Sequence, residues 1–281
     1  MGPSGKSPQT MRSGQMVLIV ILIMVIALTV GLSMISRTST DVRMTGQFED
    51  SARAFSAAEA GIEQALKSNA SSTFSLPDGT QVTTNFQPIS GTSAVYSVPA
   101  ASTRVGTVAT VFLTGHAADG TLDFSTAYAQ PTVTICYTPA STEIPALEAI
   151  VYYKTGAEYR LFRWATDPVA ATDRGQFNGF AAQAAVPGGC GLSGTVYAFP
   201  LTVIPVAGAQ PAFVRIKSYY ADASVSIAPA GGAALPRQGD QIDASGVAPG
   251  GVTRKITVIR QYRAPSSYFD HVIYSQNAFV Q

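Results

Sequence analysis

The side chains that most often carry chemistry are few in this chain, and their spacing assembles no catalytic or metal site. His116 and His271 are the only histidines, and neither has a second ligand two or four residues away, as a zinc site on one element requires. The stretch "GLSGT" at 191–195 lacks the Gly-x-Ser-x-Gly pattern of a nucleophile elbow. No glycine-rich phosphate-binding loop occurs. We therefore predict that the protein is not an enzyme and has no cofactor or metal.

Acidic pairs and aromatic side chains are the remaining candidates for binding. The acidic pairs are Asp119/Asp123 and Asp167/Asp173, and their spacing is looser than that of a calcium loop, which favours solvated turn residues. The aromatic side chains that could line a glycan-binding or adhesive face are Tyr152, Tyr153, Tyr219, Tyr220 and Trp164. Because alternation along strands sends half of such side chains into the core, a specific adhesive patch is the less favoured interpretation.

Two cysteines, Cys136 and Cys190, lie far apart in the sequence and have no Cys-x-x-Cys partner. In an exported domain they form a candidate disulfide, which would stabilise the fold by about 4 kcal/mol in the chain-entropy model. The alternative is a pair of unpaired buried thiols, because the sequence does not set the distance between them.

Composition points to an exported β-protein. Charged residues make up 12% of the 281 residues, against roughly a quarter in an average soluble domain. The net charge of +1 and the lack of a basic cluster give no footprint for nucleic acid. A surface poor in charge and rich in Ser, Thr and Gln favours an extracytoplasmic location.

The apolar run Met16–Ile35 is long enough to cross a membrane, at about 30 Å as a helix. It is longer than the apolar region of a secretion signal, and the residues after it are a poor cleavage site. We therefore expect a single-pass membrane protein. Basic residues flank the run almost equally, so the size and composition of the C-terminal part place that part outside the cytoplasm.

The predicted helix continues beyond the membrane to Lys67, for a total of about 80 Å. No proline interrupts 37–67, and apolar residues recur there at steps of mostly three and four. This stripe consists of Val42, Met44, Phe48, Ala52, Phe55, Ala58, Ile62 and Leu66. We expect Phe48, Phe55 and Ile62 to pack the stalk against its own β-region or against a neighbouring chain.

The N-terminal quarter of the chain resembles PilX-type minor pilins and related type IV pilin-like proteins. The resemblance covers about residues 12–68 and rests on a short basic leader ending in Gly14, the apolar start "QMVLIV", and the stalk motifs "RMTG" at 43–46 and "AFSAAEAG" at 54–61. It implies that a prepilin peptidase cuts after Gly14 and that the new N-terminus, Gln15, is methylated. Met16, Val17, Leu18 and Ile19 would then begin an assembly helix.

The resemblance also implies binding partners and an order of assembly steps. Before assembly the helix would lie in membrane lipid beside an inner-membrane assembly platform, and it would then pack among other pilin subunits in a filament at the cell surface. Major pilins carry Glu at the fifth mature position, where this chain has Ile19, which implies a minor subunit at the tip or at the start of assembly. The alternatives are a pseudopilin-like component of a type II-like secretion system and a surface-anchored β-domain that binds a ligand.

From Ser72 onward the sequence changes to short alternating runs bounded by turn residues. These runs predict an α+β protein in which the long helix precedes a sandwich-like, all-β C-terminal region. The expected division is a leader at 1–14, a helix at 15–68, a β-rich region at 69–139 and a β-sandwich-like region at 140–281, with the last boundary in Pro139–Pro145. The final run "FDHVIYS", 269–275, reads as a strand that contains His271, and it resembles the C-terminal strands of large PilX-like proteins.

Overall fold

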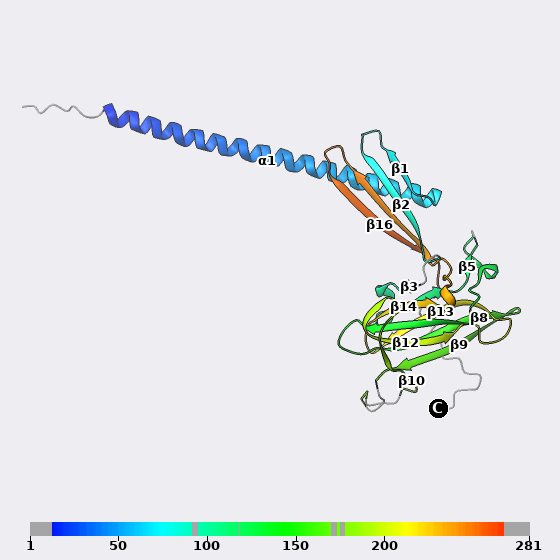
Figure 1. Cartoon of the computed structure of the whole chain (residues 1–281). Coiled ribbons are helices and arrows are strands. Elements are labelled where there is room, and N and C mark those ends of the chain that lie inside the picture. Colours follow the sequence, from blue (N-terminus) through cyan, green and yellow to red (C-terminus); the bar gives the residue numbers. More distant parts are fainter. Residues whose placement is uncertain (1–12, 92–94, 118, 170–172, 175–177, 267–281) are drawn as a thin grey trace, which may run out of the picture. The chain divides into compact units, whose positions relative to one another are not determined.

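The structure, a computed structural model, describes residues 13–91, 95–117, 119–169, 173–174 and 178–266. It belongs to the α+β class predicted from the sequence, with one long N-terminal helix followed by a β-rich region (Figure 1). The helix α1 spans Ser13–Ser68, so its predicted extent is confirmed to within a few residues. Asn69 ends it with a positive φ of 51° and donates its N–H to the carbonyl of Ala65 at 2.8 Å. This left-handed cap satisfies a carbonyl that the helix leaves unpaired.

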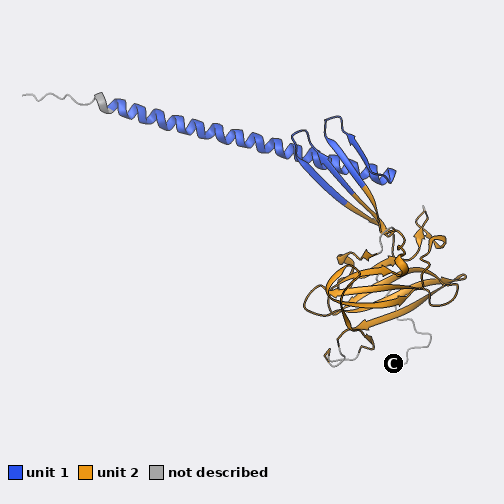
Figure 2. Ribbon diagram, viewed as in Figure 1, with its two compact units in different colours: residues 1–85, 243–257 blue, residues 86–242, 258–281 orange. Residues whose placement is uncertain are grey.

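The chain divides into two compact units, each built from segments that are distant in sequence (Figure 2). The first comprises 1–85 and 243–257, and the second comprises 86–242 and 258–281. The expected boundary between 139 and 140 is wrong, because the strands on both sides of it belong to the second unit. The structure instead inserts the second unit between segments that form the first.

A four-stranded sheet packs on the C-terminal part of α1. Its order is β1-β2-β15-β16, where β1 is Ser72–Ser75, β2 is Gln81–Ile89, β15 is Gly239–Val247 and β16 is Thr253–Gln261. Small side chains on α1 allow a close approach: a Cβ on Gly61 would lie 2.7 Å from the nearest carbon of Val82. On the sheet, a Cβ on Gly246 would lie 2.1 Å from the carbonyl oxygen of Ala54.

The second unit contains two five-stranded sheets that share one core, so the predicted sandwich lies within this unit. The first sheet has the order β10-β9-β8-β13-β4, with bounds Ala181–Ala182, Glu158–Asp167, Ala146–Thr155, Gln210–Tyr219 and Val108–Phe112. The second sheet has the order β11-β12-β7-β14-β3, with bounds Ala185–Gly189, Leu192–Thr202, Thr132–Pro139, Ala223–Pro229 and Tyr96–Ser97. A small sheet pairs β5 (Gly115–His116) with β6 (Leu122–Asp123). Single turns of 3-10 helix lie at Ala100–Ser102, Phe124–Thr126 and Ala230–Gly232.

The sandwich core is formed by the inward-facing residues of both sheets. Its fully buried side chains include Val111, Ile135, Leu147, Leu201, Ile216 and Ile227. Tyr137 carries the main polar group of this core, and its hydroxyl lies 3.1 Å from that of Thr166. Burial raises the pKa of Tyr137 well above its ordinary value.

Candidate functional site

The expected processing site lies in the first turn of α1. Gly14 and Gln15 belong to the helix, and most of the expected leader, 1–12, lies outside the described residues. The residues that follow, Met16, Val17, Leu18 and Ile19, are all exposed. An apolar helix segment that is exposed in this way within the described part of the chain requires an apolar environment from elsewhere.

The exposed apolar surface extends over the whole apolar run. Every large apolar side chain from Met16 to Ile35 is exposed, and α1 is long and apolar enough to cross a membrane. The helix has internal partners for its own backbone groups, which is the condition for lying in lipid. A single membrane-spanning helix is therefore compatible with the structure.

The stalk packs on its sheet through only part of the predicted stripe. Ile62 is 8% exposed and faces the sheet, whereas Phe55 is 47% exposed and Phe48 is 75% exposed. Of the two partners expected for these residues, Ile62 packs against the chain's own β-region, whereas Phe48 and Phe55 do not. Their packing against a neighbouring chain stays a prediction. The face that meets the sheet consists mainly of small residues, namely Ala54, Ala57, Ala58, Gly61 and Ala65. Small residues recurring every three or four positions were the sequence signal for this face.

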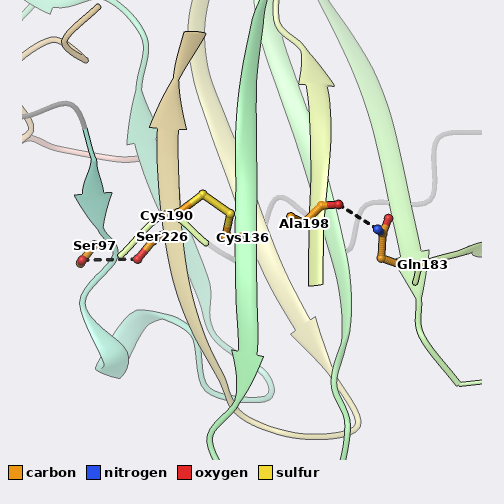
Figure 3. Close-up of a disulfide and its surroundings, with 6 residues drawn as sticks. All are labelled: Ser97, Cys136, Gln183, Cys190, Ala198 and Ser226. Atoms are coloured by element: carbon orange, nitrogen blue, oxygen red, sulfur yellow. Dashed lines mark hydrogen bonds between the residues drawn. A yellow bond between two sulfur atoms is a disulfide. The ribbon is translucent and has the colours of Figure 1, made fainter. Parts of the chain in front are cut away.

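The structure joins Cys136 and Cys190 in a disulfide, the pairing considered from the sequence (Figure 3). Cys136 lies on the central strand β7, and Cys190 lies in the turn between β11 and β12 with a positive φ of 48°. The bond spans 54 residues, so it ties the β11–β12 hairpin to the middle of its own sheet. A hydrogen bond between the hydroxyls of Ser97 on β3 and Ser226 on β14 joins neighbouring strands, and the side-chain amide of Gln183 donates to the carbonyl of Ala198 on β12 (Figure 3).

The other polar candidates are engaged in local structure. Asp119 accepts hydrogen bonds from the hydroxyl and N–H of Thr121, which lower its pKa. Asp123 accepts in the same way from Ser125. His116 stacks on Tyr262 with ring centroids 3.7 Å apart, and burial lowers its pKa. The second histidine, His271, lies outside the described residues.

Asp167 has a partner that the sequence did not reveal. Its carboxylate accepts two hydrogen bonds from the Arg174 guanidinium, at 2.7 and 2.9 Å, and a third from Asn178. The expectation of a solvated turn residue is therefore wrong for Asp167, which is buried in an ion pair with Arg174. The Arg174 guanidinium also lies 4.0 Å from the ring centroid of Tyr220, so the arginine joins two of the candidates singled out in the sequence.

The aromatic candidates do not form one face. Tyr153 is buried, Tyr152 stacks on Phe213 with ring centroids 4.7 Å apart, and Trp164 is partly exposed on β9. Within the residues that the structure describes, no group of three or more His, Cys, Asp or Glu side chains is placed to hold a metal ion.

Comparison with protein-family models, with curated proteins and with solved structures finds no match to this chain. Its function must therefore be inferred from its own surfaces. Two of these are unusual: the apolar surface of α1 and the exposed strand β9. The first was predicted from the sequence, and the second was not.

Proposed function

We propose that the protein is a minor subunit of a type IV pilus-like filament. In this proposal α1 lies in the membrane before assembly and packs among the helices of other subunits afterwards. The β-rich units lie outside the cytoplasm, where an oxidising environment maintains the Cys136–Cys190 disulfide.

The observation that carries the proposal is the length of the exposed apolar surface on α1. From Met16 to Phe48 the helix rises about 48 Å, whereas the hydrocarbon core of a bilayer is about 30 Å thick. Val42, Met44 and Phe48 are all more than half exposed and lie beyond the apolar run that a bilayer would cover. In a filament, neighbouring helices would cover both the apolar run and these three residues beyond it. A passive anchor needs an apolar surface only over the thickness of the bilayer.

A type II-like secretion pseudopilin would use the same helix in the same way. The two readings differ in the assembly produced, since only a pilus subunit enters long extracellular filaments. We favour the pilus subunit on the resemblance of residues 12–68, which includes the stalk motifs at 43–46 and 54–61.

The test is the mature N-terminus of the protein isolated from its native membrane. We expect intact-mass and N-terminal peptide analysis to find a chain that begins at methylated Gln15. A Gly14→Leu variant should retain the leader and disappear from the sheared filament fraction. A Gly5→Leu variant makes the same change away from the junction, so it should be processed normally.

An uncut wild-type chain would contradict the proposal. It would leave α1 as a permanent anchor and the β-units as a tethered module whose purpose lies in a ligand. Processing at Gln15 with the protein confined to the cell envelope would instead support the secretion-system alternative.

A further inference from the structure

Cys136 lies on the outer face of its sheet and not in the sandwich core. On β7, Val133, Ile135 and Tyr137 belong to the core, and alternation along a strand places Cys136 on the opposite face. Cys136 is nevertheless only 1% exposed. Another part of the chain must therefore cover it from outside.

The cover is the turn between β11 and β12. A Cβ on Gly189 would lie 3.7 Å from the sulfur of Cys136 and 3.9 Å from a methyl carbon of Val196. Val196 is placed like Cys136, because its neighbour Tyr197 belongs to the core while Val196 faces outward and is fully buried. The turn therefore covers two side chains that the sandwich itself leaves on its surface.

The turn has little of its own to hold it in this position. Residues 188–191 are Gly-Gly-Cys-Gly, so Cys190 supplies their only side chain. All four residues have a positive φ, between 48° and 153°. Glycine adopts such a φ readily but loses more backbone entropy on ordering than any other residue, and a positive φ is uncommon for a cysteine. The disulfide is therefore the bond that fixes this turn over Cys136 (Figure 3).

The two cysteines differ in access to solvent. Cys190 is half-buried, whereas Cys136 is almost completely buried. Thiol–disulfide exchange begins when a thiolate attacks one sulfur of the disulfide, so an incoming thiolate meets Cys190 first. Because both cysteines lie outside the sandwich core, the turn can move away without disturbing that core.

We propose that the Cys136–Cys190 disulfide is a site of thiol–disulfide exchange in the folded protein, with a dithiol reductant as the co-reactant. A thiolate of the reductant attacks the sulfur of Cys190 and forms a mixed disulfide, and the sulfur of Cys136 leaves as a thiolate that takes up a proton. The second thiolate of the reductant attacks the reductant's own sulfur in the mixed disulfide and releases Cys190. The reductant becomes a disulfide, and the protein gains two thiols.

Reduction releases the turn 188–191 and uncovers Cys136 and Val196, while the two sheets of the sandwich stay folded. In the reverse direction, the disulfide closes on a sandwich that has already folded. The inference is independent of the proposed function, because it concerns the second unit alone.

The experiment is iodoacetamide labelling of the full chain with Cys190→Ser, in detergent. The thiol of Cys136 should react at a rate that does not change with urea below the unfolding transition, because only the turn has to move. The control is Val133→Cys in a Cys136→Ser/Cys190→Ser background. It places a thiol on the same strand at a position that is also 1% exposed but belongs to the core. We expect the control to react at least about tenfold more slowly and with a steep dependence on urea.

Reduced glutathione identifies the sulfur that is attacked. Brief treatment of the wild-type chain, quenched in acid and followed by peptide mass spectrometry, should find glutathione on Cys190. After treatment with dithiothreitol, the amides of 188–195 should exchange at least about tenfold faster, while peptides from β8 and β13 remain protected.

Labelling of Cys136 that is as slow and as dependent on urea as that of the core control would overturn the proposal. A Cys190→Ser chain that does not fold would also overturn it, because the sandwich would then depend on the bond. Glutathione on Cys136 would overturn the assignment of Cys190 as the sulfur attacked. Labelling of Cys136 that is independent of urea, together with glutathione on Cys190, would establish exchange in the folded protein.

Discussion

Asp167 is the residue whose charge contributes most clearly to the second unit. Burial by itself raises the pKa of this carboxyl, but hydrogen bonds from Arg174, from the N–H of Val169 and from Asn178 outweigh it and hold the pKa below the ordinary value. In the unfolded chain the group titrates near pH 3.9. Its contribution to stability is therefore complete above that pH and is lost as the pH falls through the lower, folded value.

We predict that Asp167→Asn lowers the free energy of unfolding of the second unit at pH 7 by about 3 kcal/mol, because it leaves a nearly buried Arg174 without its carboxylate. The loss should shrink as the pH is lowered from 5 to 2. Urea denaturation followed by the fluorescence of Trp164, the only tryptophan, measures both effects. Asp119→Asn is the control, since that carboxyl bonds only within its own exposed turn, and its midpoint at pH 7 should match the wild type. A loss that is the same at pH 2 as at pH 7 would contradict this assignment.

At this scale, sequence patterns predicted residues that act with chain neighbours and missed those that act through the fold. The turn at Asp119 follows from Asp-Gly spacing, and the structure places Gly120 at a positive φ of 85°. The Asp167–Arg174 pair had no such pattern, because it depends on how the chain after β9 folds back on the last residue of that strand. The disulfide was proposed from composition and compartment, and only the fold brings its two Cα atoms to 6.0 Å.

Among the elements, α1 has two glycines, Gly61 and Gly46, whose surroundings differ sharply. A Cβ on Gly61 would meet side-chain atoms of Val82 and Thr84 at 2.7 and 2.9 Å, whereas a Cβ on Gly46 would meet nothing within 4 Å. We predict that Gly61→Ala loosens the helix from its sheet by about 1–2 kcal/mol, after its gain in helix propensity. Gly46→Ala should instead stabilise the helix by up to about 1 kcal/mol.

Hydrogen exchange of the α1 amides between 54 and 66 measures the effect of Gly61→Ala, which should make their exchange about tenfold faster. The amides around residue 46 measure the effect of Gly46→Ala, which should slow their exchange. If Gly61→Ala leaves the amides at 54–66 unchanged, the close approach of α1 to β2 is not part of the folded state in solution.

The same helix shows which part of its packing the sequence did not predict. Large apolar residues at helical spacing usually mark the buried face, yet here the sheet meets Ile62 together with a stripe of alanines and one glycine. The alternating runs after Ser72 likewise predicted strands but not which of them pair, such as β2 and β15, since period-two alternation carries no information about the partner. The assumed order of domains along the chain was wrong for that reason.

At the scale of the whole molecule, the face of α1 left exposed is the one that assembly would use. Burying one phenylalanine in a helix–helix contact is worth about 1.5–3 kcal/mol. We therefore predict that Phe48→Ser reduces the amount of this subunit in sheared filaments by at least about tenfold. Because Phe48 is 75% exposed, the same change should alter the unfolding free energy of the isolated chain by less than about 0.5 kcal/mol.

Ile62→Ser provides the contrast, because Ile62 is buried against the sheet of its own chain. It should accelerate hydrogen exchange in the first unit as well as reduce incorporation, whereas Phe48→Ser should affect incorporation alone. Filaments that contain Phe48→Ser at the wild-type level would show that the exposed stripe is not an assembly surface. The apolar length of α1 beyond the bilayer would then need a different cover, and the proposed function would lose the observation on which it rests.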